Sequence, residues 1–105
     1  MSTRYEALVS KIYSGQVAIL DSGTSTELER RGATMDDQVW SALVSIESFE
    51  SLVETHQAYI DAGADVITVN GYASSRLVLE SAGLADDVRT INMKNIEAAL
   101  LARER

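Results

Sequence analysis

A carboxylate and three small residues follow a short apolar segment near the N-terminus. Val17–Leu20 is apolar, and Asp21, Ser22, Gly23 and Thr24 come directly after it. A carboxylate is costly to bury unless a positive charge meets it. Asp21 is therefore a candidate to bind a cationic ligand group. The simpler interpretation is that Asp21 only caps the turn that follows it, by accepting hydrogen bonds from backbone N–H groups.

Two short strands and several helices are expected to position this turn. Val17–Leu20 and Val66–Val69 are short apolar runs of the kind that form buried strands. Before them, apolar residues within 5–12 recur at the spacing of one helix face. Thr24 and Glu27 have the spacing of a capping box. Caps and glycine stops predict four further helices, at 24–31, 48–62, 75–82 and from 86 onward.

The alternation of helical and strand segments predicts the fold class. Strands that alternate with helices imply a parallel sheet with right-handed crossovers. Only two strands are present, and a parallel pair needs further partners and cover on both faces. We therefore expect an α/β chain that is part of a (β/α)₈ barrel, a fold of about 250 residues. Residues 1–105 would be one partial domain, with an N-terminal helix and the first two β/α units.

Composition excludes several kinds of partner. The net charge is −7, and the 9 basic residues form no stripe that would bind nucleic acid. The acidic balance and the lack of a long apolar run argue against a membrane partner. No signal peptide is recognisable, so we expect a cytoplasmic protein. The sequence holds no cysteine, which excludes a thiolate metal site within this chain.

Two segments in this order and spacing resemble the N-terminal part of the homocysteine S-methyltransferase family. They are Ile19–Gly32 and Tyr59–Ser74, with Trp40 and His56 between them. The family includes betaine–homocysteine methyltransferases and the homocysteine domain of cobalamin-dependent methionine synthase. The resemblance implies a (β/α)₈ barrel that transfers a methyl group to the sulfur of L-homocysteine, giving methionine. L-homocysteine and a methyl donor are then the expected partners.

The resemblance also implies roles for four residues around one ligand. Asp21 matches the aspartate that contacts the ammonium group of the substrate. Gly23 and Thr24 match the adjoining turn, whose backbone N–H groups would meet the substrate carboxylate. Asn70 matches an asparagine at the same mouth, where its amide can donate and accept hydrogen bonds. No catalytic residue and no metal ligand is assigned in this chain.

The sequence departs from the family pattern in three ways. Ser22 replaces the middle glycine of Asp-Gly-Gly, where a Cβ would be harmful if the backbone φ were positive. Val69 and Gly71 replace the threonines that usually flank the asparagine. The family binds zinc through cysteine thiolates on later strands, and that zinc favours the thiolate of the substrate. This chain lacks those cysteines, so we expect a truncated family member that is inactive alone.

Two alternatives from other classes stay open. The segment 18–25 also resembles the catalytic turn of aspartic proteases, and a dimer would pair two copies of Asp21 around a shared proton. The helical periodicity after Ser25 argues against that mostly β fold. The other alternative is a non-enzymatic chain that docks or forms a homo-oligomer through open strand edges. A phosphate-binding loop is disfavoured, because Asp21 would repel the anion.

Simple structural interpretations are preferred for the remaining polar and aromatic residues. His56 is expected to pack on an apolar helix face with one hydrogen bond, because no second histidine could share a metal. Trp40 and Tyr72 are expected to be packing residues, although Tyr72 could line a pocket. The pairs 36–37 and 86–87 are interpreted as helix or turn caps.

Overall fold

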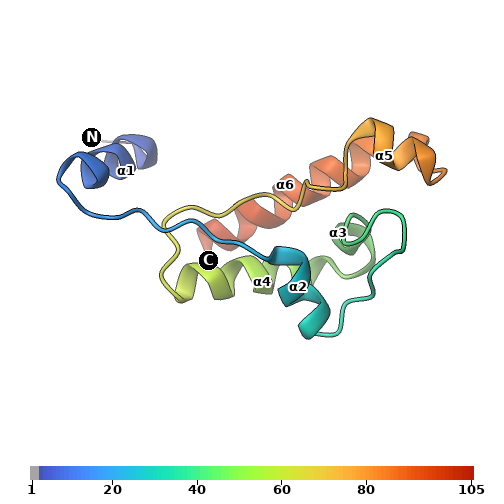
Figure 1. Ribbon diagram of the computed structural model, residues 1–105, viewed down its shortest axis with the longest axis horizontal. Coiled ribbons are helices and arrows are strands. Elements are labelled where there is room, and N and C mark those ends of the chain that lie inside the picture. The colour runs from blue at the N-terminus through green and yellow to red at the C-terminus, as the bar shows by residue number, and fades with distance from the viewer. Residues whose placement is uncertain (1–2) are drawn as a thin grey trace.

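Helices joined by long extended segments make up the computed structural model, which describes residues 3–105 (Figure 1). The molecule is elongated, with extents of 47 × 25 × 21 Å. Among the described residues, no helix combines the length and apolar character that crossing a membrane requires. The helices are α1 (Arg4–Tyr13), α2 (Thr24–Arg30), α3 (Val44–Glu47), α4 (Phe49–Asp61), α5 (Arg76–Ser81), the 3₁₀ turn η1 (Ala85–Asp87) and α6 (Val88–Glu104).

The core lies between α4 and α6, with α2 and α3 packed around them. Leu52 and Val53 of α4 meet Ala98 and Ala102 of α6, and all four side chains are buried. Their spacing of three or four residues puts each set on one helix face. The alanines allow α4 to approach α6 closely. A second cluster, beside α5, consists of Val39, Ala42, Leu79 and Ile91.

The predicted N-terminal helix is present as α1, but it stands apart from the core (Figure 1). Thr3 and Glu6 form a capping box, each side chain accepting a hydrogen bond of 3.0 Å from the backbone N–H of the other. No residue of α1 is buried. Its apolar stripe is therefore correctly predicted but uncovered, and an ion pair of 2.7 Å between Lys11 and Asp65 ties it to the rest of the chain.

The expected partial (β/α)₈ barrel is wrong for this chain. The segments 17–20 and 66–69 run alongside each other (Figure 1), but within residues 3–105 they form no strand. They meet in a single parallel bridge, Leu20 with Val66. Its hydrogen bonds run from Val66 N to Ile19 O and from Asp21 N to Val66 O, each 3.1 Å long.

Two aspartates explain why the ladder stops after one bridge. In a parallel pair, successive N–H groups donate to backbone carbonyls of the neighbouring strand. Here the Ile19 N–H donates instead to the carboxylate of Asp65 at 2.8 Å. At the other end, the Thr68 N–H donates to both oxygens of Asp21, at 3.0 and 3.1 Å. Side-chain acceptors therefore take the amides that would have extended the sheet, and no further strand is present to support the pair.

The predicted capping box of Thr24 and Glu27 does not form. Gly23 occupies the N-cap position of α2, with φ 65° and no side-chain hydrogen bond. The carboxylate of Glu27 pairs with Arg30 and Arg31 instead. These hydrogen bonds lower the pKa of Glu27 to about 2, with Arg30 the larger cause.

The two acidic pairs interpreted as caps differ in outcome. Asp36 caps its turn, because its carboxylate accepts from the N–H groups of Gln38 at 2.8 Å and Val39 at 3.0 Å. Asp86 lies inside η1, and Asp87 precedes α6 without a side-chain hydrogen bond. The cap at 86–87 is therefore wrong.

Candidate binding pocket

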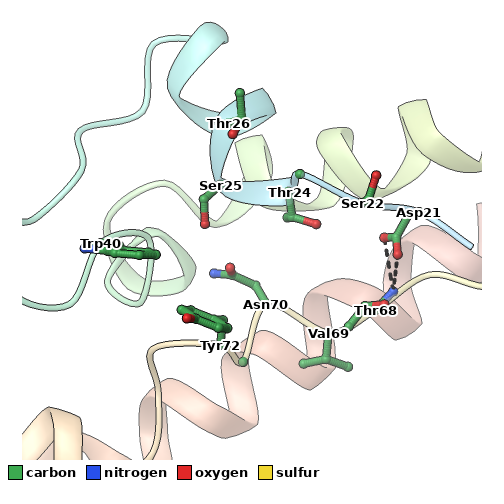
Figure 2. Close-up of a pocket in the computed structure, with 12 residues that line it drawn as sticks. Asp21, Ser22, Thr24, Ser25, Thr26, Trp40, Thr68, Val69, Asn70 and Tyr72 are labelled. Carbon is green, nitrogen blue, oxygen red and sulfur yellow. Dashed lines mark hydrogen bonds between the residues drawn. The ribbon is translucent and has the colours of Figure 1, made fainter.

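A pocket of about 630 Å³ lies where the two extended segments meet α2 and the loop before α3 (Figure 2). Three separate stretches of the chain form it. All four residues to which the family resemblance assigns a role contribute to its wall. The lining residues are Asp21, Ser22, Gly23, Thr24, Ser25, Thr26, Trp40, Thr68, Val69, Asn70, Gly71 and Tyr72.

Asp21 is the charged group of this pocket. Its side chain belongs to a residue that is only 5% exposed. Within residues 3–105 its carboxylate has one partner, the Thr68 N–H, and it takes part in no ion pair. A carboxylate has about four acceptor positions. Asp21 therefore keeps spare acceptor capacity on the side of the pocket.

His56 lies behind Asp21 without neutralising it. The residue is fully buried on α4, which confirms that it packs there. The predicted hydrogen bond is wrong, since neither ring nitrogen has a partner within the described residues 3–105. Burial lowers the pKa of His56, and the nearby charge of Asp21 opposes this only in part. His56 is therefore neutral at pH 7 and supplies no countercharge.

Asn70 is held by a buried network rather than left free for a ligand. Its Nδ2 donates to the carbonyl of Ser41 at 2.9 Å and to Oδ1 of Asn95 at 3.3 Å. Its Oδ1 accepts from the Ser41 hydroxyl at 2.9 Å. Both amide hydrogens are therefore used inside the protein, and only a lone pair on Oδ1 remains for a ligand. No local pattern in the sequence indicates Ser41 and Asn95 as its partners.

The turn after Asp21 accommodates the departure at Ser22. Among non-glycine residues in the described part of the chain, only Trp40 has a positive φ, so the Cβ of Ser22 costs no strain. Gly23 takes the left-handed conformation instead, with φ 65°. The Tyr59 hydroxyl donates to the Gly23 carbonyl at 3.4 Å and braces the turn.

Trp40 and Tyr72 form an aromatic wall across the pocket from Asp21 (Figure 2). Their rings stack with centroids 5.5 Å apart and an interplanar angle of 20°. The residues are 52% and 85% exposed, so they pack against each other at the surface, and Tyr72 lines the pocket. Trp40 has φ 49°, a strained conformation for a side chain of this size. Two backbone hydrogen bonds of 2.9 Å with Asp36 hold it there.

The pocket combines charged, polar and aromatic surface. A negative charge lies at one side of the pocket, hydroxyl groups of α2 line it, and aromatic faces close the other side. No group of three or more His, Cys, Asp or Glu side chains that could hold a metal occurs in the part of the chain that the structure describes. With no cysteine in the sequence, the residues present do not fit the zinc that the family resemblance implies.

Comparison with known proteins places these residues in a family. Residues 18–105 match the sequence profile described as Homocysteine S-methyltransferase. Homocysteine S-methyltransferase 1 of Arabidopsis thaliana is 33% identical over 105 residues, which are 99% of this chain and 32% of that protein. Homocysteine S-methyltransferase 2 of Zea mays is 35% identical over 92 residues, covering 87% of this chain and 27% of that protein.

A related enzyme name also occurs among the similar proteins. Selenocysteine Se-methyltransferase of Brassica oleracea var. italica is 35% identical over 91 residues, covering 86% of this chain and 26% of that protein. No solved structure matches the chain. The chain spans between about a quarter and a third of the length of these relatives. The profile match includes every residue of the pocket, and the chain belongs to the homocysteine S-methyltransferase family.

Proposed function

We propose that this chain supplies the part of a homocysteine S-methyltransferase that holds the amino-acid end of L-homocysteine. One observation carries the proposal: Asp21 is a buried carboxylate beside a pocket, and its partner is a single backbone N–H. A buried charge without a countercharge is unfavourable. The ammonium group of an amino acid would provide that countercharge and donate hydrogen bonds to the free lone pairs of Asp21.

The rest of the pocket suits the other groups of an amino acid. Gly23 and Thr24 form the turn beside Asp21, and we propose that this turn meets the substrate carboxylate. The Thr24 hydroxyl lines the same pocket and is able to donate to a carboxylate oxygen. Val69 and the rings of Trp40 and Tyr72 provide apolar surface for the methylene groups and the sulfur.

The methyl transfer itself needs groups beyond those described here. In that reaction a bond forms between the methyl carbon and the homocysteine sulfur, the bond from the methyl carbon to its donor breaks, and the thiol proton leaves. Among residues 3–105, no group of three or more His, Cys, Asp or Glu side chains could hold a metal. We propose that the chain binds the substrate and does not turn it over alone.

Titration with two ligands tests the assignment of the ammonium group to Asp21. Trp40 is the only tryptophan in the sequence and lines the pocket, so its fluorescence reports binding. We expect a saturable change with L-homocysteine and none with 4-mercaptobutanoate, which keeps the carboxylate and thiol but lacks the ammonium. An equal response to the two compounds would overturn the proposal.

We also propose that the chain self-associates through the paired segments. Val17, Ile19 and Leu20 are 76%, 53% and 61% exposed, and the outer edges of the single bridge are unpaired. Exposed apolar segments with open edges favour pairing with a second copy. Sedimentation velocity should show dissociation on dilution, and Ile19→Lys should shift the chain to monomer. A wild-type chain that stays monomeric at high concentration would refute this.

A further inference from the structure

A directed chain of hydrogen bonds runs behind the pocket wall, and Ser41 is its central residue. Ser41 is 4% exposed and does not line the pocket. It contacts Asn70 twice, accepting from Nδ2 through its carbonyl and reaching Oδ1 with its hydroxyl, both at 2.9 Å. The hydroxyl of Ser25 lies 2.6 Å from the hydroxyl of Ser41.

The direction of every hydrogen in this chain follows from the partners. A flipped Asn70 amide would set its oxygen against the Ser41 carbonyl, so Nδ2 must face that carbonyl. Asn70 Oδ1 then faces the Ser41 hydroxyl, and an amide oxygen can only accept. The Ser41 hydroxyl therefore donates its one hydrogen to Asn70. The Ser25 hydroxyl must in turn donate its hydrogen to Ser41, because two oxygens 2.6 Å apart need a hydrogen between them.

The consequence appears on the side of the pocket. Ser25 and Asn70 both line it, reaching into the space between α2 and the second extended segment (Figure 2). Each has used its hydrogens inside the protein and shows only lone pairs to a ligand. The carboxylate of Asp21 likewise only accepts. These three side chains therefore present acceptors alone.

We propose that Ser41 is a positioning residue that fixes this acceptor-only wall and so makes the pocket select ligands with N–H donors. The inference deepens the proposed function by naming the ligand group that is recognised: an ammonium with free hydrogens, rather than any positive charge. A fully methylated ammonium has the same charge but no hydrogen to donate. Ser41 contributes this discrimination without touching the ligand.

The first test compares L-homocysteine with its N,N,N-trimethyl derivative by the fluorescence of Trp40. We expect the wild-type chain to prefer L-homocysteine by about tenfold or more, as for one hydrogen bond to a charged group. Ser41→Ala frees the Ser25 hydroxyl to turn its hydrogen toward the pocket, whereas the Ser41 carbonyl still holds the Asn70 amide, so the preference should shrink several-fold. Ser25→Ala, at a less buried position, should shrink it as well. Ser41 does not line the pocket, so Ser41→Ala leaves the space for the methyl groups unchanged and its change in ratio reports hydrogen bonding.

The matched control is Ser45→Ala, which removes another buried serine hydroxyl, one with only a 3.5 Å contact to the Ile91 carbonyl. It should leave the preference unchanged. An unchanged preference in both Ser41→Ala and Ser25→Ala would overturn the inference.

A second test needs no ligand. In a double-mutant cycle of chemical unfolding, Ser25→Ala and Ser41→Ala should together cost less than the sum of the single effects, because both break one hydrogen bond. Additive effects would overturn the inference. If the two changes are coupled but neither compound binds the wild-type chain, the proposed function fails while the hydrogen-bond chain stands.

Discussion

An aspartate accepts a backbone N–H at each end of the paired segments, but the two aspartates differ in the charge beside them. At one end Asp65 accepts from the Ile19 N–H, and at the other Asp21 accepts from the Thr68 N–H. Asp65 also has a cation, Lys11, at 2.7 Å. That hydrogen bond, with the Ile19 N–H as a smaller cause, holds the pKa of Asp65 below its usual range.

Asp21 makes the equivalent backbone contact without an ion-pair partner among residues 3–105, although it is the more deeply buried of the two. Asp65 is paired within the fold, whereas we propose that Asp21 meets a ligand. Both interrupt the ladder, but only Asp21 keeps unpaired charge at the wall of a pocket. A charge that the fold leaves uncompensated is typical of a site that a ligand completes.

The largest effect should come from removing each carboxylate in turn. We expect Asp21→Ala to lower the affinity for L-homocysteine about 100-fold or more, since the buried ammonium loses its countercharge. Asp65→Ala should change that affinity by no more than about twofold, because this variant removes no charged contact to the ligand. Fluorescence titration of Trp40 measures both. Equal losses in the two variants would show that Asp21 acts only through the backbone.

Amide hydrogen exchange should respond more to the loss of Asp65 than to a change at Asp21. Asp65→Ala removes the acceptor of the Ile19 N–H and the partner of Lys11, so we expect faster exchange at Ile19 and in α1. The conservative change Asp21→Asn keeps a side-chain oxygen for the Thr68 N–H and should leave exchange there nearly unchanged. Protection of Ile19 that survives Asp65→Ala would contradict the structural role given to Asp65.

His56, buried behind Asp21, should make the free energy of unfolding depend on pH. Burial lowers the pKa of His56 in the folded chain below its ordinary 6.5. The unfolded chain therefore binds the proton first, so the stabilisation is complete above pH 6.5 and is lost as the pH falls below it. The free energy of unfolding should drop by up to about 1.4 kcal/mol per pH unit. His56→Leu, which removes the only histidine, should flatten urea unfolding midpoints between pH 5 and pH 7, a range set by the ordinary histidine pKa. A persistent slope in that variant would refute this origin.

Local patterns in the sequence predicted most helices but not how the segments between them pair. The spacing of apolar residues located α1, α4 and α6 because it decides which face of a helix is apolar. The same rule marked 17–20 and 66–69 as strands. It could not show that Asp21 and Asp65 would take the amides of the ladder, because that depends on contacts between residues 46 or 47 positions apart.

The candidate site was predicted in part for a similar reason. A carboxylate after an apolar run is a local signal, and the family resemblance added Gly23, Thr24 and Asn70, which line the same pocket. Their roles toward a ligand remain predictions. The exposure of Trp40 and the role of Ser41 were not predicted. No local pattern indicates that a tryptophan will stay exposed, or that a serine will orient an amide 29 residues away.

The smallest effect should come from acid acting on Asp65. Its pKa is lowered in the folded chain, so its contribution is present above the ordinary value of 3.8 and disappears as the pH falls through the folded value. Because the pair with Lys11 is partly exposed to solvent and α1 buries no residue, we expect acid to release α1 before the core unfolds. Exchange rates in α1 should rise at a pH where α4 and α6 stay protected. Lys11→Gln should move that release to higher pH, since the cation is the main cause of the shift, whereas Lys94→Gln, which removes a lysine from the α6 surface, should not. If α1 and the core lost protection together, the ion pair would be part of the cooperative fold. Only ligand binding would then distinguish Asp21 from Asp65.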